Sequence, residues 1–177
     1  MSISLAIDTS TSRTIVAIVD EEKVLFESFH DGATDHGKAL PELIAAALKV
    51  APKPDRVVVG MGPGPFTGLR VGITFSHTFA LAREIPVIGV CSLDVIDIDQ
   101  SEYTVSIDAR RKEIYWASYK DGVRTSGPAV SKPSEVSNFI IGQYPNLQKL
   151  VALSTSQNIT EPMYLRRPDA VPTAERA

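Results

Sequence analysis

The feature that most constrains the fold is a short loop rich in glycine and proline, which separates a strand-like segment from a long apolar one. Residues 56–59 are Arg-Val-Val-Val, and residues 60–68 read Gly-Met-Gly-Pro-Gly-Pro-Phe-Thr-Gly. Glycine admits backbone angles that a side chain forbids, whereas proline fixes φ, so a loop that contains both holds one defined shape. The sequence therefore predicts a strand, a tight loop and a helix over 67–84, with Thr67 as the helix N-cap.

Two alternative roles are open to this loop. A glycine-rich turn ahead of a helix can bind a phosphate group with its backbone N–H groups, and Gly62 and Gly64 would then belong to a nucleotide loop. The loop lacks the lysine of a P-loop and does not have the glycine spacing of dinucleotide-binding folds. The alternative is a structural corner between a strand and a helix.

The helix expected over 67–84 carries a small residue at every fourth position. Such residues form a ridge that lets another helix approach closely, and here they are Gly68, Gly72, Ser76 and Ala80. Leu69 and Ile73 lie beside the ridge, and apolar residues occur on nearly every face of the helix. This distribution indicates burial on more than one side, against either a partner protein or the core of the chain itself.

Residues 34–51 predict the other long helix. Its apolar stripe has the spacing of helical turns and consists of Leu40, Leu43, Ile44, Ala47, Leu48 and Ala51. Pro41 fits only the first turn of a regular helix, so the helix either begins near Leu40 or has a kinked turn before it. His36 follows Asp35 and is interpreted as a surface or capping residue rather than as a metal ligand.

The first thirty residues predict a three-stranded meander with strands at 3–8, 14–20 and 23–29. Asp8 ends the first strand, and a turn rich in serine and threonine follows it. Such a turn can bind an anion through its N–H and hydroxyl groups while the carboxylate binds a cation. Asp8, Thr9 and Thr11 are therefore candidate nucleotide-loop residues, although the same composition is typical of an ordinary turn.

The remaining segments predict two lobes. A strand at 85–90 follows the second helix, and the βαβ alternation implies parallel pairing. We place the lobe boundary between residues 98 and 99. The second lobe, 99–177, is expected to begin with three strands, at 104–107, 113–119 and 123–130. A helix over 132–142 and a strand at 147–153 should follow them. The tail over 154–177 is expected to be extended and to be anchored by residues 164–167. Asp108 ends a strand before a polar turn as Asp8 does, which indicates an internal duplication.

Composition indicates a soluble globular protein of the cytoplasm. Hydrophobic residues make up 44% of the chain and charged residues 22%, and the net charge is −3, with no excess of positive charge for nucleic acid. We find neither an apolar run long enough for a membrane span nor a signal peptide. Cys91 is the single cysteine and fits a reducing compartment. No catalytic motif and no metal-ligand spacing is recognised, so no catalytic residue, metal or resident cofactor is expected.

Several of these segments together resemble the bacterial TsaB family, also called YeaZ. The most specific of them is the central loop with the start of its helix, residues 62–72. The other segments that carry the resemblance are residues 6–10, His36 with residues 40–41, and residues 86–90, 107–111, 113–115 and 162–166. The resemblance thus covers nearly the whole chain.

The resemblance implies an α/β, actin/hexokinase-like fold with two lobes of βββαβα type, of which the second is reduced here. It also implies a role in forming threonylcarbamoyladenosine on the tRNA adenosine next to the anticodon. In that pathway the catalytic subunit is TsaD, a paralogue, and the ATPase TsaE assists in a larger complex. A TsaB protein is the non-catalytic subunit that heterodimerises with TsaD. For this chain we expect a homodimer in isolation, since a helix pair that binds a paralogue can also bind its own copy, and contact with tRNA only indirectly.

Docking onto TsaD is implied for the two helices of the first lobe. The expected interface residues are Leu40, Leu43, Ile44, Ala47, Gly68, Leu69, Gly72, Ile73, Ser76 and Ala80. Two alternatives remain for the function. The first is an ATP-dependent phosphotransferase or ATPase of the same fold, which would bind ATP or ADP at Asp8 and the glycine loop. The second is an M22-type peptidase.

Three features depart from the family pattern. Pro65 stands where the family usually has serine, which stiffens the loop and removes a hydroxyl group. A glycine is common in the family around positions 76–78, where this chain has Ser-His-Thr. The second lobe is short, which leaves little material for a nucleotide cleft between the lobes, so ATP or ADP binding is expected only weakly or in a complex.

Overall fold

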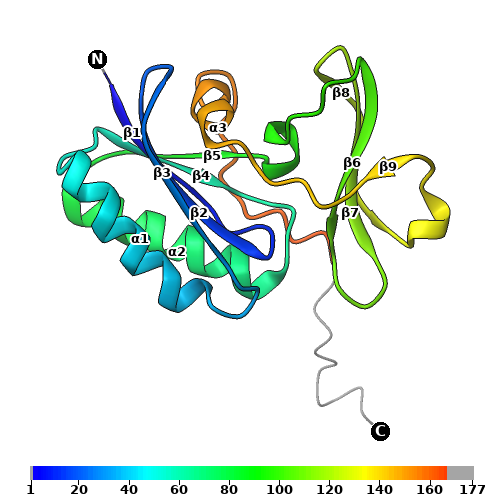
Figure 1. The fold of residues 1–177 in the computed structure, drawn as a ribbon, viewed down its shortest axis with the longest axis horizontal. Coiled ribbons are helices and arrows are strands. Elements are labelled where there is room, and N and C mark those ends of the chain that lie inside the picture. The colour runs from blue at the N-terminus through cyan, green and yellow to red at the C-terminus, as the bar shows by residue number, and fades with distance from the viewer. Residues whose placement is uncertain (1, 167–177) are drawn as a thin grey trace, which may run out of the picture.

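The computed structural model describes residues 2–166 and has two lobes, each built on one β-sheet (Figure 1). In the first lobe the strand order is β3-β2-β1-β4-β5. The antiparallel meander consists of β1 (Ile3–Asp8), β2 (Arg13–Asp20) and β3 (Lys23–Asp31), and β4 (Arg56–Gly60) and β5 (Val87–Val90) run parallel to β1. The strands expected in this lobe are thus confirmed.

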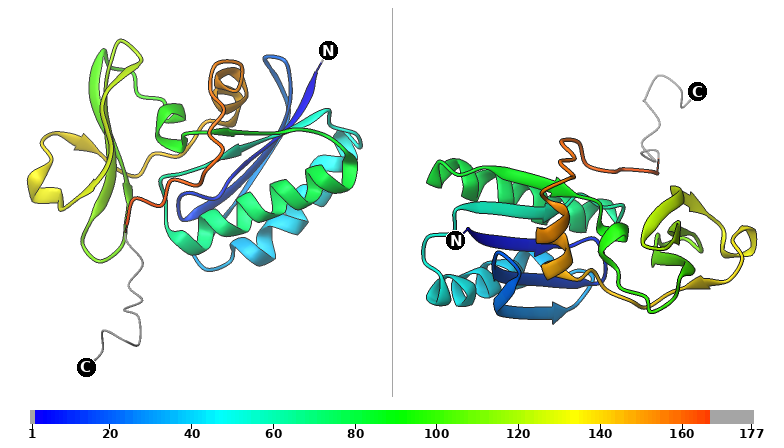
Figure 2. Two further views of the ribbon diagram at one scale, coloured as in Figure 1. Left: turned by 180° about the vertical axis from the view of Figure 1, so that it is seen from behind. Right: turned by 90° about the horizontal axis from the view of Figure 1, so that it is seen from above.

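Helices cover both faces of the first sheet. The helices α1 (His36–Val50) and α2 (Phe66–Arg83) lie on one face, and α3 (Leu147–Leu153) lies on the other (Figures 1 and 2). Because neighbouring side chains of a strand point to opposite faces, Leu5 packs toward α1 and α2 while Ala6 packs toward α3. The sheet is therefore buried on both sides, which explains its continuous apolar strands.

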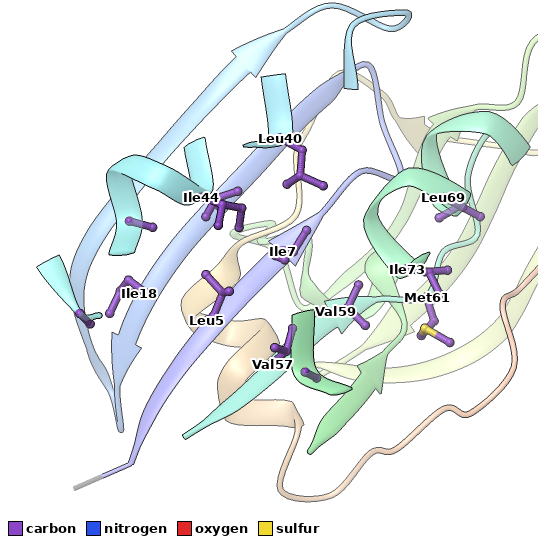
Figure 3. Packing of buried hydrophobic residues seen from close by; sticks show 14 residues of the cluster. Leu5, Ile7, Ile18, Leu40, Ile44, Val57, Val59, Met61, Leu69 and Ile73 are labelled. Carbon is purple, nitrogen blue, oxygen red and sulfur yellow. The ribbon is translucent and has the colours of Figure 1, made fainter. Parts of the chain in front are cut away.

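The main core lies between the sheet and the helix pair. Figure 3 shows that side chains of β1 and β4 lie opposite side chains of both helices. The residues that meet there are Leu5, Ile7, Val57, Val59, Leu40, Ile44, Leu69 and Ile73. Burying one apolar side chain of this size contributes about 1.5–3 kcal/mol, so this layer is the principal source of stability of the first lobe.

The second lobe repeats the strand order of the first. Its sheet runs β8-β7-β6-β9, with an antiparallel meander and a fourth strand parallel to the first, as in β3-β2-β1-β4. Its strands are β6 (Glu102–Asp108), β7 (Ile114–Lys120), β8 (Val123–Ser131) and β9 (Phe139–Ile140). The repetition confirms the expected internal duplication and the two-lobed actin/hexokinase-like fold with a reduced second lobe.

The turns after the first strands of the two lobes also correspond. Asp8 Oδ1 accepts a hydrogen bond from the backbone N–H of Ser10 at 2.8 Å, and Asp108 Oδ1 accepts one from the N–H of Arg110 at 2.8 Å. An aspartate that accepts from the second following N–H closes a tight turn without further help. The two aspartates therefore share a structural role.

Two expectations for the second lobe are wrong. The helix expected over 132–142 is only a 3₁₀ turn at Pro133–Glu135, since the backbone becomes extended at Val136 and left-handed at Asn138 (φ 52°). The strand expected at 147–153 is the helix α3. Its N-terminus is capped by the side chain of Asn146, which accepts a hydrogen bond from the N–H of Lys149 at 3.0 Å. Leu147, Leu150 and Val151 of α3 are buried against the first sheet.

The helix starts of the first lobe also differ from expectation. Helix α1 begins at His36, so Pro41 lies inside it and the alternative with a turn before Leu40 applies. Helix α2 begins at Phe66, with Pro65 at the N-cap position. Thr67 therefore lies within the first turn and makes no capping hydrogen bond, because its own backbone is already helical.

The tail is extended, as expected, and runs from the first lobe to the second (Figure 2). The N–H of Ile159 donates to the carbonyl of Gly89 at 2.8 Å, and the N–H of Met163 donates to the carbonyl of Met61 at 2.9 Å. Arg166 then forms an ion pair with Glu113 of the second lobe. Of the expected anchor 164–167, the structure describes residues up to Arg166, and position 167 onward lies outside the described residues.

Candidate functional site

The two candidate loops meet at one edge of the first sheet. Strands β1 and β4 are parallel neighbours, so their carboxyl ends, Asp8 and Gly60, lie side by side. The turn after β1 contacts the start of α2, where the hydroxyl group of Thr9 donates to the carbonyl of Gly68 at 2.7 Å. The structure thus brings the expected nucleotide-loop residues together.

Asp8 is the centre of a closed hydrogen-bond network. Its side chain is fully buried, and Oδ1 accepts hydrogen bonds from the N–H and the hydroxyl group of Ser10 at 2.8 and 2.6 Å. Oδ2 accepts from the hydroxyl group of Ser92 at 2.7 Å. Burial raises the pKa of Asp8, and the hydrogen bonds oppose this shift only in part. Both carboxylate oxygens are therefore occupied by groups of the chain itself.

The glycine loop lies directly on this network. A Cβ atom at Gly60 would overlap Asp8 Oδ2 and lie 2.6 Å from Ser92 Oγ, and a Cβ atom at Gly64 would lie 2.8 Å from Ser10 Cα. Gly62 has a φ of 91°, which a side chain rarely permits. Such contacts leave no room for a phosphate group between the loops. In this structure the loop forms a tight corner and Asp8, Thr9, Thr11, Gly62 and Gly64 are all buried. Their assignment to a nucleotide loop stays a prediction.

The buried carboxyl group predicts a specific dependence of stability on pH. Because the pKa of Asp8 is raised in the folded chain above its ordinary value of 3.8, the protonated form favours folding. The contribution of Asp8 to the free energy of unfolding is complete below about pH 4 and is lost as the pH rises through the pKa of Asp8 in the folded chain. We expect Asp8→Asn, which stays neutral, to lose less stability than the wild type between pH 4 and pH 8. Urea denaturation of both proteins across this range measures the difference, and parallel stability curves would contradict it.

His36 is a buried side chain, which corrects its interpretation as a surface or capping residue. It is 4% exposed, and its Nδ1 lies 2.8 Å from the hydroxyl oxygen of Thr14. The ring packs against Gly68, where a Cβ atom would lie 3.1 Å from Nε2. Burial lowers the pKa of His36, so the neutral ring is favoured. His36 thus fixes the start of α1 against β2 and α2.

The small-residue ridge of α2 faces the interior of the chain. A Cβ atom at Gly72 would overlap Thr9 Oγ1, and the hydroxyl group of Ser76 donates to the carbonyl of Gly72 at 2.8 Å. All the expected interface residues except Leu43, which is half-buried, are buried in the core: Leu40, Ile44, Ala47, Gly68, Leu69, Gly72, Ile73, Ser76 and Ala80. Their side chains are enclosed by the chain's own sheet in this structure, and their assignment to a partner interface stays a prediction.

The outer face of the same helices is accessible and partly apolar. Val71, Phe75 and Phe79 of α2 are half-buried at the margin of the core, and Phe75 and Phe79 stack with their ring centroids 5.7 Å apart. Leu81 is 81% exposed near the end of α2. We call this accessible surface of α2 the outer helix face.

A second, partly buried network joins the lobes to the tail, and no sequence signal pointed to it. Asp94 Oδ1 accepts hydrogen bonds from the hydroxyl group of Tyr119 at 2.8 Å and from Arg124 at 3.1 Å, and its Oδ2 accepts from the side chain of Gln157 at 2.7 Å. Cys91 lies beside this group, and burial raises the pKa of its thiol to about 11. The thiol therefore stays protonated at neutral pH and is a poor nucleophile.

Two other kinds of site do not occur among the described residues. Within 2–166, no three His, Cys, Asp or Glu side chains gather closely enough to hold a metal ion. No helix in the same range is long and apolar enough to cross a membrane.

Comparison with known proteins identifies the family. Residues 30–170 match the family model described as TsaD: tRNA N6-adenosine threonylcarbamoyltransferase. The tRNA threonylcarbamoyladenosine biosynthesis protein TsaB of Bacillus subtilis is 32% identical over 129 residues, which cover 67% of this chain and 56% of that protein. The chain belongs to the TsaB (YeaZ) family. TsaB of Escherichia coli is 31% identical over 136 residues, 66% of this chain and 54% of that protein.

A more similar relative is longer than this chain. The uncharacterized protein Rv3421c of Mycobacterium tuberculosis is 39% identical over 203 residues, which cover 98% of this chain and 96% of that protein. An alignment of 203 positions against a chain of 177 residues leaves at least 26 positions without a counterpart here. The chain spans little more than half the length of the named TsaB relatives.

Two solved structures share the fold of this chain. YeaZ from Pseudomonas aeruginosa superposes with a TM-score of 0.74 at 24% identity, over 88% of this chain and 92% of that chain. An uncharacterized protein with similarity to peptidase YeaZ from the same organism gives a TM-score of 0.79 at 24% identity, over 94% and 100%. At this level of identity the likeness supports the TsaB-family fold and carries no conclusion about activity.

Proposed function

We propose that this chain is a non-catalytic cytoplasmic subunit in the formation of threonylcarbamoyladenosine on tRNA, and that it acts by docking onto TsaD. The observation that carries the proposal is the contrast between the two candidate surfaces. The loops that would hold a nucleotide are packed on each other, whereas α2 keeps Leu81 exposed and Val71, Phe75 and Phe79 half-buried at the margin of the core. The names of the TsaB relatives support the same pathway.

The surroundings of Asp8 favour the role of a non-catalytic subunit over that of an enzyme with the same fold. Phosphoryl transfer requires metal ions and cationic groups around the phosphates. Asp8 is enclosed by Ser10 and Ser92 and has no oxygen directed to an open site. A role as an ATPase would thus require the loop to separate from the turn, at the expense of several buried hydrogen bonds.

The outer helix face is proposed to serve two alternative pairings. TsaD is a paralogue, so the corresponding surface on TsaD is expected to resemble this one. A surface that pairs with a paralogue also pairs with its own copy, which predicts a homodimer in isolation. TsaE would join the heterodimer in a larger complex without replacing either subunit.

Light scattering on a sizing column tests this proposal. We expect a homodimer for the chain alone, and a peak at the heterodimer mass after mixing with TsaD of the same organism, at the expense of the homodimer. Proteins that elute separately at micromolar concentrations would contradict the proposal. In that case ATP binding by the isolated chain, with Asp8→Ala as the control, becomes the decisive measurement for the enzyme alternative.

A further inference from the structure

Three separate segments of the chain meet where the two lobes join. The 3₁₀ turn Ser92–Val95 follows β5 at the end of the first lobe, the sheet of the second lobe faces it, and the tail passes beside both (Figure 2). A buried hydrophobic cluster lies between them, and its members are Cys91, Leu93, Ile96, Val105, Ile107, Ala117 and Tyr119. Ile159 and Met163 of the tail pack against this cluster. The two lobes and the tail thus share one core.

One carboxylate group contacts all three segments at the rim of this core. Asp94 lies in the 3₁₀ turn, and its side chain is 9% exposed. Its Oδ1 accepts hydrogen bonds from Tyr119 of β7 and Arg124 of β8, at 2.8 and 3.1 Å. Its Oδ2 accepts one from Gln157 at the start of the tail, at 2.7 Å. The second lobe and the tail are therefore bound to the same side chain of the first lobe.

The second connection between the lobes does not use Asp94. Residues 141–146 return from the second lobe to α3, and in the right-hand view of Figure 2 they pass the junction on the side opposite the tail. Pro145 pairs with Ile96, and the N–H of Asn146 donates to the carbonyl of Val95 at 2.8 Å. These contacts would remain if the carboxylate released its partners. The second lobe would then turn about this connection rather than separate from the first lobe.

The end of the described tail covers one side of the glycine loop. The N–H of Met163 donates to the carbonyl of Met61 at 2.9 Å, and the ring of Tyr164 lies 4.9 Å from that of Phe66 at the start of α2. Closer to the start of the tail, the N–H of Ile159 donates to a carbonyl of β5. Release of the tail would therefore uncover this side of the glycine loop.

We propose that Asp94 is a lock, which holds the second lobe and the tail closed as one cooperative unit. Three donors share the two oxygens of a carboxylate with little access to water, so the loss of any one leaves a poorly solvated charge. Once the second lobe turns away, the tail loses the apolar surface on which it packs, and the two open together. The lock thus decides whether the glycine loop is covered. It goes beyond the proposed docking, because none of its residues lies in α1 or α2.

Tyr119→Phe tests the lock, because it removes a hydroxyl group that donates to Asp94 and keeps the ring in the cluster. The full chain is treated with dithionitrobenzoate at pH 8. The modification rate of Cys91, the only cysteine and a buried one, measures how often the junction opens. We expect this rate to rise about tenfold or more, as for the loss of a hydrogen bond to a charged group. Amide exchange of Ile159 and Met163, followed by NMR, should accelerate by the same factor.

Tyr103→Phe is the matched control. Tyr103 packs against the same cluster and stacks on Tyr119 with the ring centroids 5.1 Å apart. In the described part of the chain its hydroxyl group does not donate to Asp94. The same chemical change there should leave the modification of Cys91 and the exchange of the tail amides at the wild-type rates.

Four outcomes would overturn the proposal. Unchanged rates in Tyr119→Phe would mean that the apolar cluster alone closes the junction. Faster modification of Cys91 without faster exchange in the tail would mean that the lobe and the tail open separately. Equal acceleration in Tyr103→Phe would assign the effect to the ring packing, and equal acceleration of the amides of Leu5 and Val58 in the first sheet would assign it to global unfolding. Pairing with TsaD is measured separately on the sizing column, so failure of the lock is distinguished from failure of the proposed docking.

Discussion

Replacing Gly60 with alanine is expected to destabilise the chain by about 3–6 kcal/mol, because at least two hydrogen bonds to a buried carboxyl group, each worth about 1.5–3 kcal/mol, would be broken. The added Cβ atom would overlap Asp8 Oδ2 and lie 2.6 Å from Ser92 Oγ. Moving the carboxylate away would break its hydrogen bonds to Ser10 and Ser92, and a fully buried carboxylate has no water to replace them. Urea denaturation at pH 7 measures the loss directly.

The matched control is Gly37→Ala. Gly37 also lacks a side chain, but it is exposed in α1 and a Cβ atom there would meet nothing within 4 Å. Alanine is the better helix former, so this variant should gain up to about 1 kcal/mol. A Gly60→Ala variant as stable as the wild type would show that the glycine loop can move away from Asp8, and the phosphate-binding alternative for the loop would then return.

Most strands and helices of the first lobe could be predicted from the sequence, because the patterns that indicate them lie within short segments of the chain. Alternating and β-branched residues indicated each strand, and the stripe from Leu40 to Ala51 indicated α1. The loop at 60–65 was recognisable as a tight corner from its glycines and prolines alone. The starts of the helices were less accurate, since Pro65 rather than Thr67 precedes α2.

The errors arose where a distant part of the chain decides the outcome. Gly68 and Gly72 have the spacing of a helix-packing ridge, but the group that needs the space is the turn at Thr9, about sixty residues earlier in the chain. Whether Asp8 holds a ligand depends on Ser92, which is 84 residues away. For α3 a local signal did exist, since Asn146 is a strong N-cap and Leu147, Leu150 and Val151 have helical spacing.

Changing Leu81 to arginine is expected to weaken pairing with TsaD by about a hundredfold, which corresponds to about 2.7 kcal/mol. Leu81 is 81% exposed on the outer helix face, so the substitution removes nothing from the core of the isolated chain. In the complex the arginine would place an unpaired charge in an apolar interface, where desolvation is costly. Titration of TsaD on the sizing column at increasing concentrations measures the shift.

Val123→Arg is the matched control for this prediction. Val123 is also an exposed aliphatic residue, at 68%, but it lies at the start of β8 in the second lobe, away from the outer helix face. The same chemical change there should leave both the homodimer and the heterodimer intact. Equal thermal stability of the two variants would exclude unfolding as the cause of any loss. If Leu81→Arg paired with TsaD as tightly as Val123→Arg does, the C-terminal end of α2 would lie outside the interface, because a buried arginine without a partner cannot be neutral in energy.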